Sequence, residues 1–118
     1  MLKLNHKRLD AWRISLDFIK DIYRLTANFP RPEIYGITSQ LRRAAISVAS
    51  NIAEGASRQS KLERKRFYSI SRSSLVEVDT QLEISGQLNF IIDSELTEID
   101  KKLNRLFAML TNMINKTQ

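Results

Sequence analysis

Turn-forming residues are scarce in this chain, and their scarcity restricts the fold more than any other feature of the sequence. The 118 residues include three glycines and two prolines, and both prolines fall within one short segment, at positions 30 and 32. Few turns permit few connections, so the segments between them must be long. The length corresponds to one domain of common size. The sequence therefore predicts a single domain, residues 1–118, with a short flexible N-terminal segment at 1–8.

Hydrophobic residues recur with the period of an α-helix, and no segment alternates as a β-strand does. Apolar side chains three and four residues apart predict helices at four places: about 9–28, 33–54, 60–88 and from 94 onward. Ser60 and Glu63 form the capping-box pattern at the start of the third segment. Gly55 is expected to end the second helix, and Ser94 to cap the fourth. Four helices with short links predict an all-α fold, an antiparallel up-down-up-down four-helix bundle.

Each helix is expected to bury one apolar face. The second segment places Ile34, Ile37, Leu41, Ala45, Val48 and Ile52 on such a face, and the third places Phe67, Ser74, Val78 and Leu82 there. In the fourth segment the expected seam, with coiled-coil spacing, consists of Ile99, Leu103, Leu106, Leu110 and Met113. The serines that surround position 71 fit close helix packing, since their side chains are small.

The first segment carries two apolar rows, and a bundle helix covers only one. The row expected to face the core consists of Leu9, Trp12, Leu16, Ile19 and Tyr23. A large exposed apolar patch is unusual on a monomeric protein, so the second row predicts an interface with another copy of the chain. Together with isoleucines on the second and third segments, the expected interface residues are Ile14, Phe18, Ile22, Leu25, Ile46, Ile70 and Ile84.

Positive charge is concentrated in the middle of the chain. The whole chain carries a formal net charge of +6, and the segment 42–72, with eight basic and two acidic residues, carries the same net charge by itself. Such a cluster is typical of proteins that contact polyanions. The candidate residues for nucleic-acid binding are Arg42, Arg43, Arg58, Lys61, Arg64, Lys65 and Arg72. An ordinary solvated basic face explains the same pattern equally well, because no RNA- or DNA-binding motif accompanies it.

Residues that could carry out catalysis or hold a metal are few. There is no cysteine, and His6 is the sole histidine, with no acidic pair or second histidine near it in the sequence. The i, i+4 carboxylate pairs Asp17/Asp21 and Asp79/Glu83 lack the Glu-x-x-His element of a bundle-core metal site. No Gly-rich phosphate loop or GxSxG element is present. The sequence thus predicts no catalytic residues, no metal, no cofactor and no enzyme activity.

The sequence also predicts where the protein resides. The longest uncharged stretches, 44–53 and 106–115, are 10 residues each, whereas a membrane helix needs about 20 apolar residues. The basic N-terminus has no apolar region of the kind found in secretory signals. A cytoplasmic protein without membrane contact is expected.

Two longer motifs resemble a known family. The segment 29–36 reads FPRPEIYG, and residues 51–55 read NIAEG. Both are similar to elements of the small bacterial four-helix-bundle proteins encoded in intervening sequences of 23S rRNA genes. The resemblance covers nearly the whole chain, although Ser73 stands where that family is expected to have glycine and Ile37 where leucine is expected.

The resemblance implies a ring-like homo-oligomer, plausibly a pentamer, with no established enzymatic activity. The family is also similar in fold to the accessory proteins of diversity-generating retroelements, basic oligomers thought to engage a reverse transcriptase and nucleic acid. Two hypotheses follow for this chain. The first is a non-enzymatic homo-oligomeric bundle that binds nucleic acid, RNA before DNA, through its basic surface. The alternative is a scaffold for protein–protein interaction with no nucleic-acid role.

Overall fold

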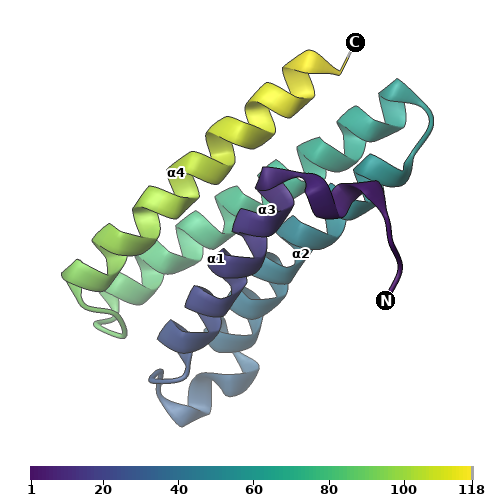
Figure 1. Cartoon of the computed structure of the whole chain (residues 1–118). Coiled ribbons are helices and arrows are strands. Elements are labelled where there is room, and N and C mark those ends of the chain that lie inside the picture. The colour runs from purple at the N-terminus through teal and green to yellow at the C-terminus, as the bar shows by residue number, and fades with distance from the viewer. Residues whose placement is uncertain (118) are drawn as a thin grey trace.

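The computed structural model describes residues 1–117, and these form an antiparallel four-helix bundle (Figure 1). The long helices are α1 (Asp10–Thr26), α2 (Ile37–Ser57), α3 (Lys61–Gln87) and α4 (Asp93–Lys116). Two 3-10 helices, η1 (Asn5–Arg8) and η2 (Arg31–Tyr35), precede α1 and α2. The predicted fold class is confirmed, and the bundle extends over 43 × 28 × 19 Å.

The helices contact one another in chain order around a square. Each helix packs against the next, and α1 packs against α4, whereas within the described residues the backbones of the diagonal pairs are farther apart. The α1–α2 and α3–α4 connections therefore lie at one end of the bundle, where Phe29 and Phe90 pack with ring centroids 5.5 Å apart. The α2–α3 connection lies at the opposite end (Figure 1).

The predicted ends of the helices are right in some cases and wrong in others. α1 ends at Thr26, shortly before Pro30, and the Ser60 hydroxyl accepts a hydrogen bond from the Glu63 amide at 3.3 Å. The second helix begins at Ile37 and not at 33, because residues 31–35 form η2. Gly55, however, does not end α2, which continues to Ser57. Ser94 does not cap α4, because the helix already begins at Asp93 and the Ile92 amide donates to the Glu95 carboxylate.

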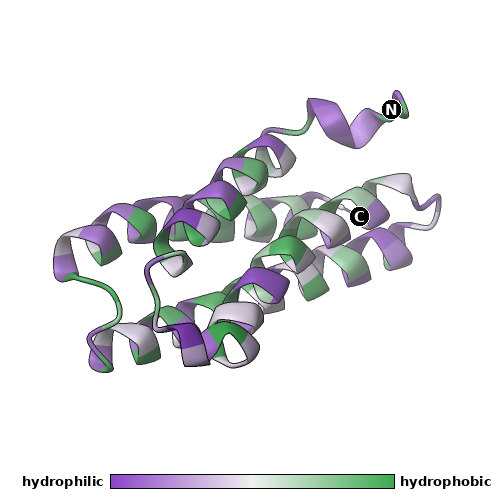
Figure 2. Ribbon diagram, turned by 90° about the horizontal axis from the view of Figure 1, so that it is seen from below, coloured by the Kyte–Doolittle hydropathy of each residue, from purple (hydrophilic) through white to green (hydrophobic). Residues whose placement is uncertain are grey.

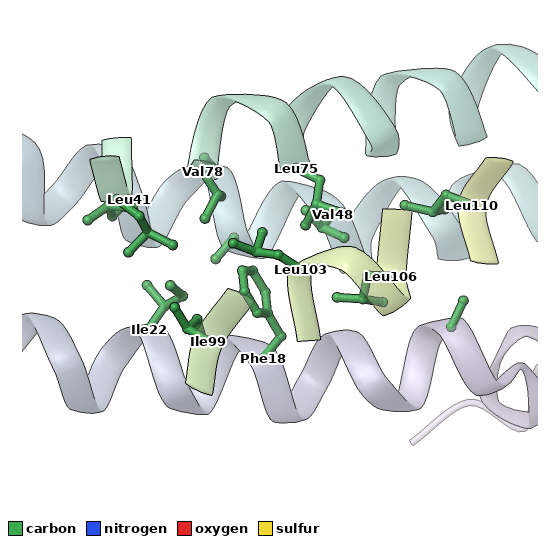
Figure 3. Packing of buried hydrophobic residues seen from close by; sticks show 14 of the residues in the cluster. Phe18, Ile22, Leu41, Val48, Leu75, Val78, Ile99, Leu103, Leu106 and Leu110 are labelled. Atoms are coloured by element: carbon green, nitrogen blue, oxygen red, sulfur yellow. The ribbon is translucent and has the colours of Figure 1, made fainter. Parts of the chain in front are cut away.

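The core lies between all four helices and contains large aliphatic side chains from each. Figure 3 shows Leu41 and Val48 of α2, Leu75 and Val78 of α3, and the α4 leucines converging on one cluster. Ile99, Leu103, Leu106 and Leu110 are buried, as the spacing of the fourth segment predicts. Hydrophobic positions line the interior of the bundle, as Figure 2 illustrates.

The two apolar rows of α1 have roles different from those the sequence predicts. Phe18 and Ile22, assigned to an outer interface, are 0% exposed and point into the core (Figure 3). Leu16 and Tyr23, assigned to the core, are 37% and 40% exposed. The interface assignment of Phe18 and Ile22 is therefore wrong.

The sequence does not show which side of α1 is buried, because that side includes small hydroxyl residues. Ser15 and Thr26 lie on that side, and both are buried. Their hydroxyls donate to carbonyls of their own helix, Ser15 to Trp12 at 2.5 Å and Thr26 to Ile22 at 2.7 Å. A polar side chain satisfied in this way can be buried without leaving a hydrogen-bonding group unpaired, so hydrophobicity alone understates this face.

The closest helix packing in the bundle is between α2 and α3. Ala44, Ala45 and Ala49 are buried on α2, and Ser71 of α3 donates a hydrogen bond to the Val48 carbonyl at 2.7 Å. The hydroxyls of Ser47 and Ser74 lie 2.8 Å apart. The small side chains of Ser47, Ser71 and Ser74 lie at this contact and allow the two backbones to approach, as the sequence suggests for Ser71 and Ser74. Ser73, in contrast, is exposed.

Gly55 is required for this packing rather than for a helix end. A Cβ at position 55 would lie 2.7 Å from Cε1 of Tyr68 and 3.2 Å from Cβ of Phe67, both on α3. Tyr68 is 6% exposed and fills the space that the missing side chain leaves. The sequence placed Phe67 on the inner face, whereas Phe67 is half-buried and Tyr68 is the buried aromatic residue.

The revised core predicts a large stability difference between two positions on α1. Phe18→Ala should lower the free energy of unfolding by about 3–5 kcal/mol, the usual cost of removing a buried phenylalanine. Leu16→Ala, on the partly exposed side, should cost well under half as much. Urea unfolding followed by circular dichroism measures both. Equal losses, or a larger loss for Leu16→Ala, would contradict the assignment of the core face.

A second pair of variants tests the close approach at Gly55. Alanine favours a helix over glycine by about 1 kcal/mol, but overpacking against Tyr68 typically costs about 1–3 kcal/mol. Gly55→Ala should therefore lower the melting temperature. Gly86→Ala is the matched control, since the new Cβ would meet only the terminal Cδ1 of Leu96 at 2.9 Å, and a flexible side-chain end can move. A higher melting temperature for Gly55→Ala than for Gly86→Ala would refute the packing role.

Candidate nucleic-acid interface

The α2–α3 connection brings basic residues from two helices to one end of the bundle. Residues 58–60 connect Ser57, the last residue of α2, to Lys61, the first of α3. The side chains of Arg58, Lys61, Arg64 and Lys65 therefore originate within about two turns of helix. Ser60 fixes the start of α3 through the hydrogen bond to the Glu63 amide, so the first turn of α3 is ordered around these residues.

Two of these arginines stabilise the connection itself. Arg58 pairs with Glu54 at 3.1 Å and lies over the ring of Phe67, 4.8 Å from its centroid. Arg64 donates from Nη1 to the carbonyls of Arg58 and Gln59 at 2.9 and 2.8 Å. Arg64 thereby provides donors for two backbone carbonyls of the α2–α3 connection. Both side chains have structural partners, although each guanidinium retains donors that these bonds do not use.

Lys61, Lys65 and Arg66 are the cations free to meet a ligand at this end. Lys61 and Arg66 are exposed and Lys65 is half-buried, and within residues 1–117 none of the three is paired with a carboxylate or bonded to another side chain. Lys61 and Lys65 are four residues apart and so lie on one side of α3. Arg66, which sequence analysis left out of the binding set, adds a further exposed charge beside Lys65.

Arg72 and Arg42 instead take part in packing between helices. Arg72 donates to the Thr111 hydroxyl of α4 at 3.0 Å and lies over the ring of Phe107. Arg42 donates from Nε to the Thr26 hydroxyl of α1 at 2.9 Å, and its guanidinium is 4.4 Å from the centroid of the Tyr23 ring. Neither contact is visible in the sequence, because each links residues on different helices.

The seven predicted residues do not form one continuous surface. Arg42 and Arg43 lie near the start of α2, whereas Arg58 follows its end. Fifteen residues of helix separate Arg43 from Arg58, which corresponds to about 22 Å at 1.5 Å per residue. The structure thus gathers Arg58, Lys61, Arg64 and Lys65 at one end and leaves Arg42 and Arg43 toward the other.

Burial affects one titratable group near the α2–α3 connection. Removal from solvent raises the pKa of the Tyr68 phenol above its ordinary value of 10.0, and the positive charge of Arg64 partly offsets that rise. The phenol therefore remains neutral at physiological pH. Asn51, which borders this end of α2, donates to the carbonyl and hydroxyl of Ser47 rather than to the turn.

Two of the residues considered for metal binding, Asp21 and His6, have other partners. Asp21 pairs with Arg24 at 3.1 Å and with Lys102 of α4. His6 packs edge-on against Trp12, with ring centroids 5.0 Å apart, so it is half-buried rather than freely solvated. Within the described part of the chain, no group of three or more histidine or acidic side chains could hold a metal ion.

Tyr35 is an exposed aromatic residue that sequence analysis did not select. The residue belongs to η2 and is 94% exposed, while the adjacent Ile34 is 47% exposed. The helix predicted over 33–54 includes Tyr35 and Ile34, whereas both residues precede α2, which begins at Ile37. The two prolines and the glycine of the FPRPEIYG segment were the one available signal that Tyr35 lies outside that helix.

Comparison with known proteins agrees with this architecture. The pattern of the family described as 23S rRNA-intervening sequence protein matches residues 7–112. The chain belongs to this family. The predicted resemblance is thereby confirmed. No curated protein matches the sequence.

A solved structure shows the same fold as this member of the 23S rRNA-intervening sequence protein family. It is the crystal structure of a protein of unknown function from the S23 ribosomal protein family of Bacteroides thetaiotaomicron. The two chains are 20% identical, with a TM-score of 0.79 over 88% of this chain and 97% of the other. At that identity the likeness establishes the fold alone. Among the described residues, no helix is long and apolar enough to cross a membrane.

Proposed function

We propose that this protein is a non-enzymatic homo-oligomeric bundle that binds nucleic acid, RNA before DNA, at the α2–α3 end. The observation that carries the proposal is the cluster of Lys61, Lys65 and Arg66, which project from the first turns of α3 without carboxylate partners. Arg58 and Arg64 fix the backbone beneath them and contribute additional positive charge.

The chemistry of this cluster fits contact with phosphates rather than with bases. Lysine and arginine side chains on a helix surface can follow a phosphate backbone without reading its sequence. Phe67 is half-buried beneath Arg58, and Tyr68 is buried, so neither offers a free ring for a base to stack on. Binding should accordingly be weakly sequence-dependent and strongly sensitive to salt.

The family supports RNA as the first polyanion to test. The chain belongs to a family whose description refers to a 23S rRNA sequence. That description places no protein on the ribosome and identifies no ligand. It does associate the family with an RNA gene, and the basic end of the bundle supplies the charge that such a partner requires.

Charge-removing variants test the proposed surface. Replacing Lys61, Lys65 and Arg66 together with glutamine should weaken retention of single-stranded RNA in filter binding by at least tenfold at low salt, because three phosphate contacts are lost. The matched control replaces Lys101, Arg105 and Lys116 of α4 with glutamine, which removes the same charge from another surface. The affinity of the control should fall far less.

The salt dependence supplies an independent measure in the same assay. For single strands, log Kobs falls against log salt with a slope of about −0.7 per neutralised phosphate. The slope of the Lys61/Lys65/Arg66 variant should therefore be shallower by about 2 units than that of the unmodified protein. Equal losses in both triple variants would show that only net charge matters. No retention of RNA or DNA by the unmodified protein would favour the protein–protein scaffold instead.

The homo-oligomer part of the proposal has support from a smaller set of residues than the sequence indicated. Ile46, Ile70 and Ile84 remain exposed at 42%, 38% and 45%, whereas Phe18 and Ile22 lie in the core. Ile14 and Leu25 are half-buried against that core. Ile70 and Ile84 are 14 residues apart, or about 21 Å along α3, so they mark separate contacts rather than one patch.

Light scattering coupled to size exclusion tests the assembly. At micromolar concentration the measured mass should be a multiple of the 13.7 kDa chain. Ile70→Glu and Ile84→Glu together should lower the mass without loss of helical circular dichroism, since both side chains lie outside the core. A mass of 13.7 kDa for the unmodified protein would contradict the homo-oligomer.

A further inference from the structure

The end of the bundle opposite the α2–α3 connection contains a second feature that the proposed nucleic-acid surface does not use. Two adjoining depressions of about 340 and 320 Å³ lie there, at the junction of α1, η2 and α2. They share Ile34, Thr38 and Arg42 as lining residues. Each volume falls within the range of small-molecule sites, about 300–1,000 Å³.

Arg42 is held in a fixed orientation between the two depressions. Its Nε donates to the Thr26 hydroxyl at 2.9 Å, Nη2 lies 3.5 Å from the Tyr23 carbonyl, and the Tyr23 ring packs against the guanidinium. These contacts use Nε fully and Nη2 in part. A guanidinium presents five N–H donors in a rigid fork, so the terminal nitrogens keep donors for a ligand. Because the Arg42 guanidinium is already oriented, less conformational entropy is lost when a ligand binds to it.

Thr38 provides an independent observation at the same place. The residue is 2% exposed, it lines both depressions, and its Oγ1 has no hydrogen-bond partner in the described structure. Buried polar side-chain atoms nearly always have a partner, and each exception requires an explanation. Thr38 and Arg42 are four residues apart and so lie on one side of α2, and both line the same two depressions.

The charges around the depressions select for an anion. Arg43 lines one depression and Arg31 the other, and both are exposed cations without an ion-pair partner in residues 1–117. No acidic residue lines either depression. Glu33, the acidic residue of η2, has its Oε2 beside Gly36 instead. The first turns of α2 also contribute the positive end of the helix dipole.

The walls of the depressions are apolar. Ile34 and Ile46 line the first, with Tyr23 at its edge, while Phe29 and Pro30 line the second. Ile34 and Tyr23 keep 47% and 40% of their surface exposed. A bare inorganic anion would leave these walls uncovered, whereas a ligand with an apolar or aromatic body would cover them.

We infer that this end of the bundle binds the terminal phosphate of a nucleotide-sized organic phosphate. Arg42, Arg43 and Thr38 hold the phosphate, and the body of the ligand covers Ile34. A phosphate monoester carries close to two negative charges at neutral pH. A ligand group with two charges matches two or three arginines better than a carboxylate group with one charge would. The site is separate from the α2–α3 surface and does not depend on the proposed function.

Isothermal titration with adenosine 5′-monophosphate, adenosine and inorganic phosphate tests the site. The monophosphate should bind most tightly, inorganic phosphate more weakly and adenosine not measurably. A phosphate monoester could belong to a free nucleotide or to the 5′ end of a nucleic-acid strand. Titration with a trinucleotide that carries or lacks a 5′-phosphate distinguishes these two sources. Binding of the monophosphate alone identifies a free nucleotide as the ligand, and binding of the 5′-phosphorylated trinucleotide as well identifies a strand end. Failure of all phosphate-bearing probes to bind would overturn the inference.

Variants locate the binding to these residues. Arg43→Gln should weaken monophosphate binding by at least tenfold, while the matched change Arg105→Gln should leave it nearly unchanged. Thr38→Val should weaken binding several-fold without lowering the melting temperature, because the hydroxyl that it removes has no partner in the protein. Monophosphate binding that survives both changes would place the ligand elsewhere. The Lys61/Lys65/Arg66 variant should retain full monophosphate binding, so failure of this site and failure of the RNA surface are distinguishable.

Discussion

The close contact between α2 and α3 is the constraint on which the rest of the structure depends. Serines on both helices and Gly55 of α2 let the two backbones approach, and Tyr68 fills the space beside the glycine. The Ser71 hydroxyl bonds to the Val48 carbonyl across this contact. A helix pair fixed in this way holds the short connection at residues 58–60 in one geometry. The basic residues that flank the connection are therefore presented by a rigid element, and not by a loose loop.

Several of the basic residues serve the fold as well as a surface. Arg42 joins α2 to α1, Arg72 joins α3 to α4, and Arg64 bonds to the α2–α3 connection. Within residues 1–117, Lys61, Lys65 and Arg66 make no such contact. This division directs attention to these three cations at the α2–α3 end, whereas the total charge would implicate the whole surface.

Helical periodicity predicts the four helices and the buried seam of α4, because each reflects spacing along one segment. It does not decide which side of α1 is buried. Both rows have the helical period, and the buried side includes Ser15 and Thr26, whose hydroxyls are satisfied within the helix. Which side of α1 is buried depends on where α2 and α4 pack against it. The partners of Arg42 and Arg72, and the depressions beside Thr38, likewise depend on contacts between helices that no single segment encodes.

The central claim is that polyanions meet this bundle at the α2–α3 end. A map of backbone amide chemical shifts during titration with a short single-stranded RNA tests that claim most directly, because it reports the contacted residues without altering the protein. The account predicts that the largest shifts fall within residues 58–66 and that α4 changes little. Largest shifts on α4, or shifts spread evenly over all four helices, would contradict it.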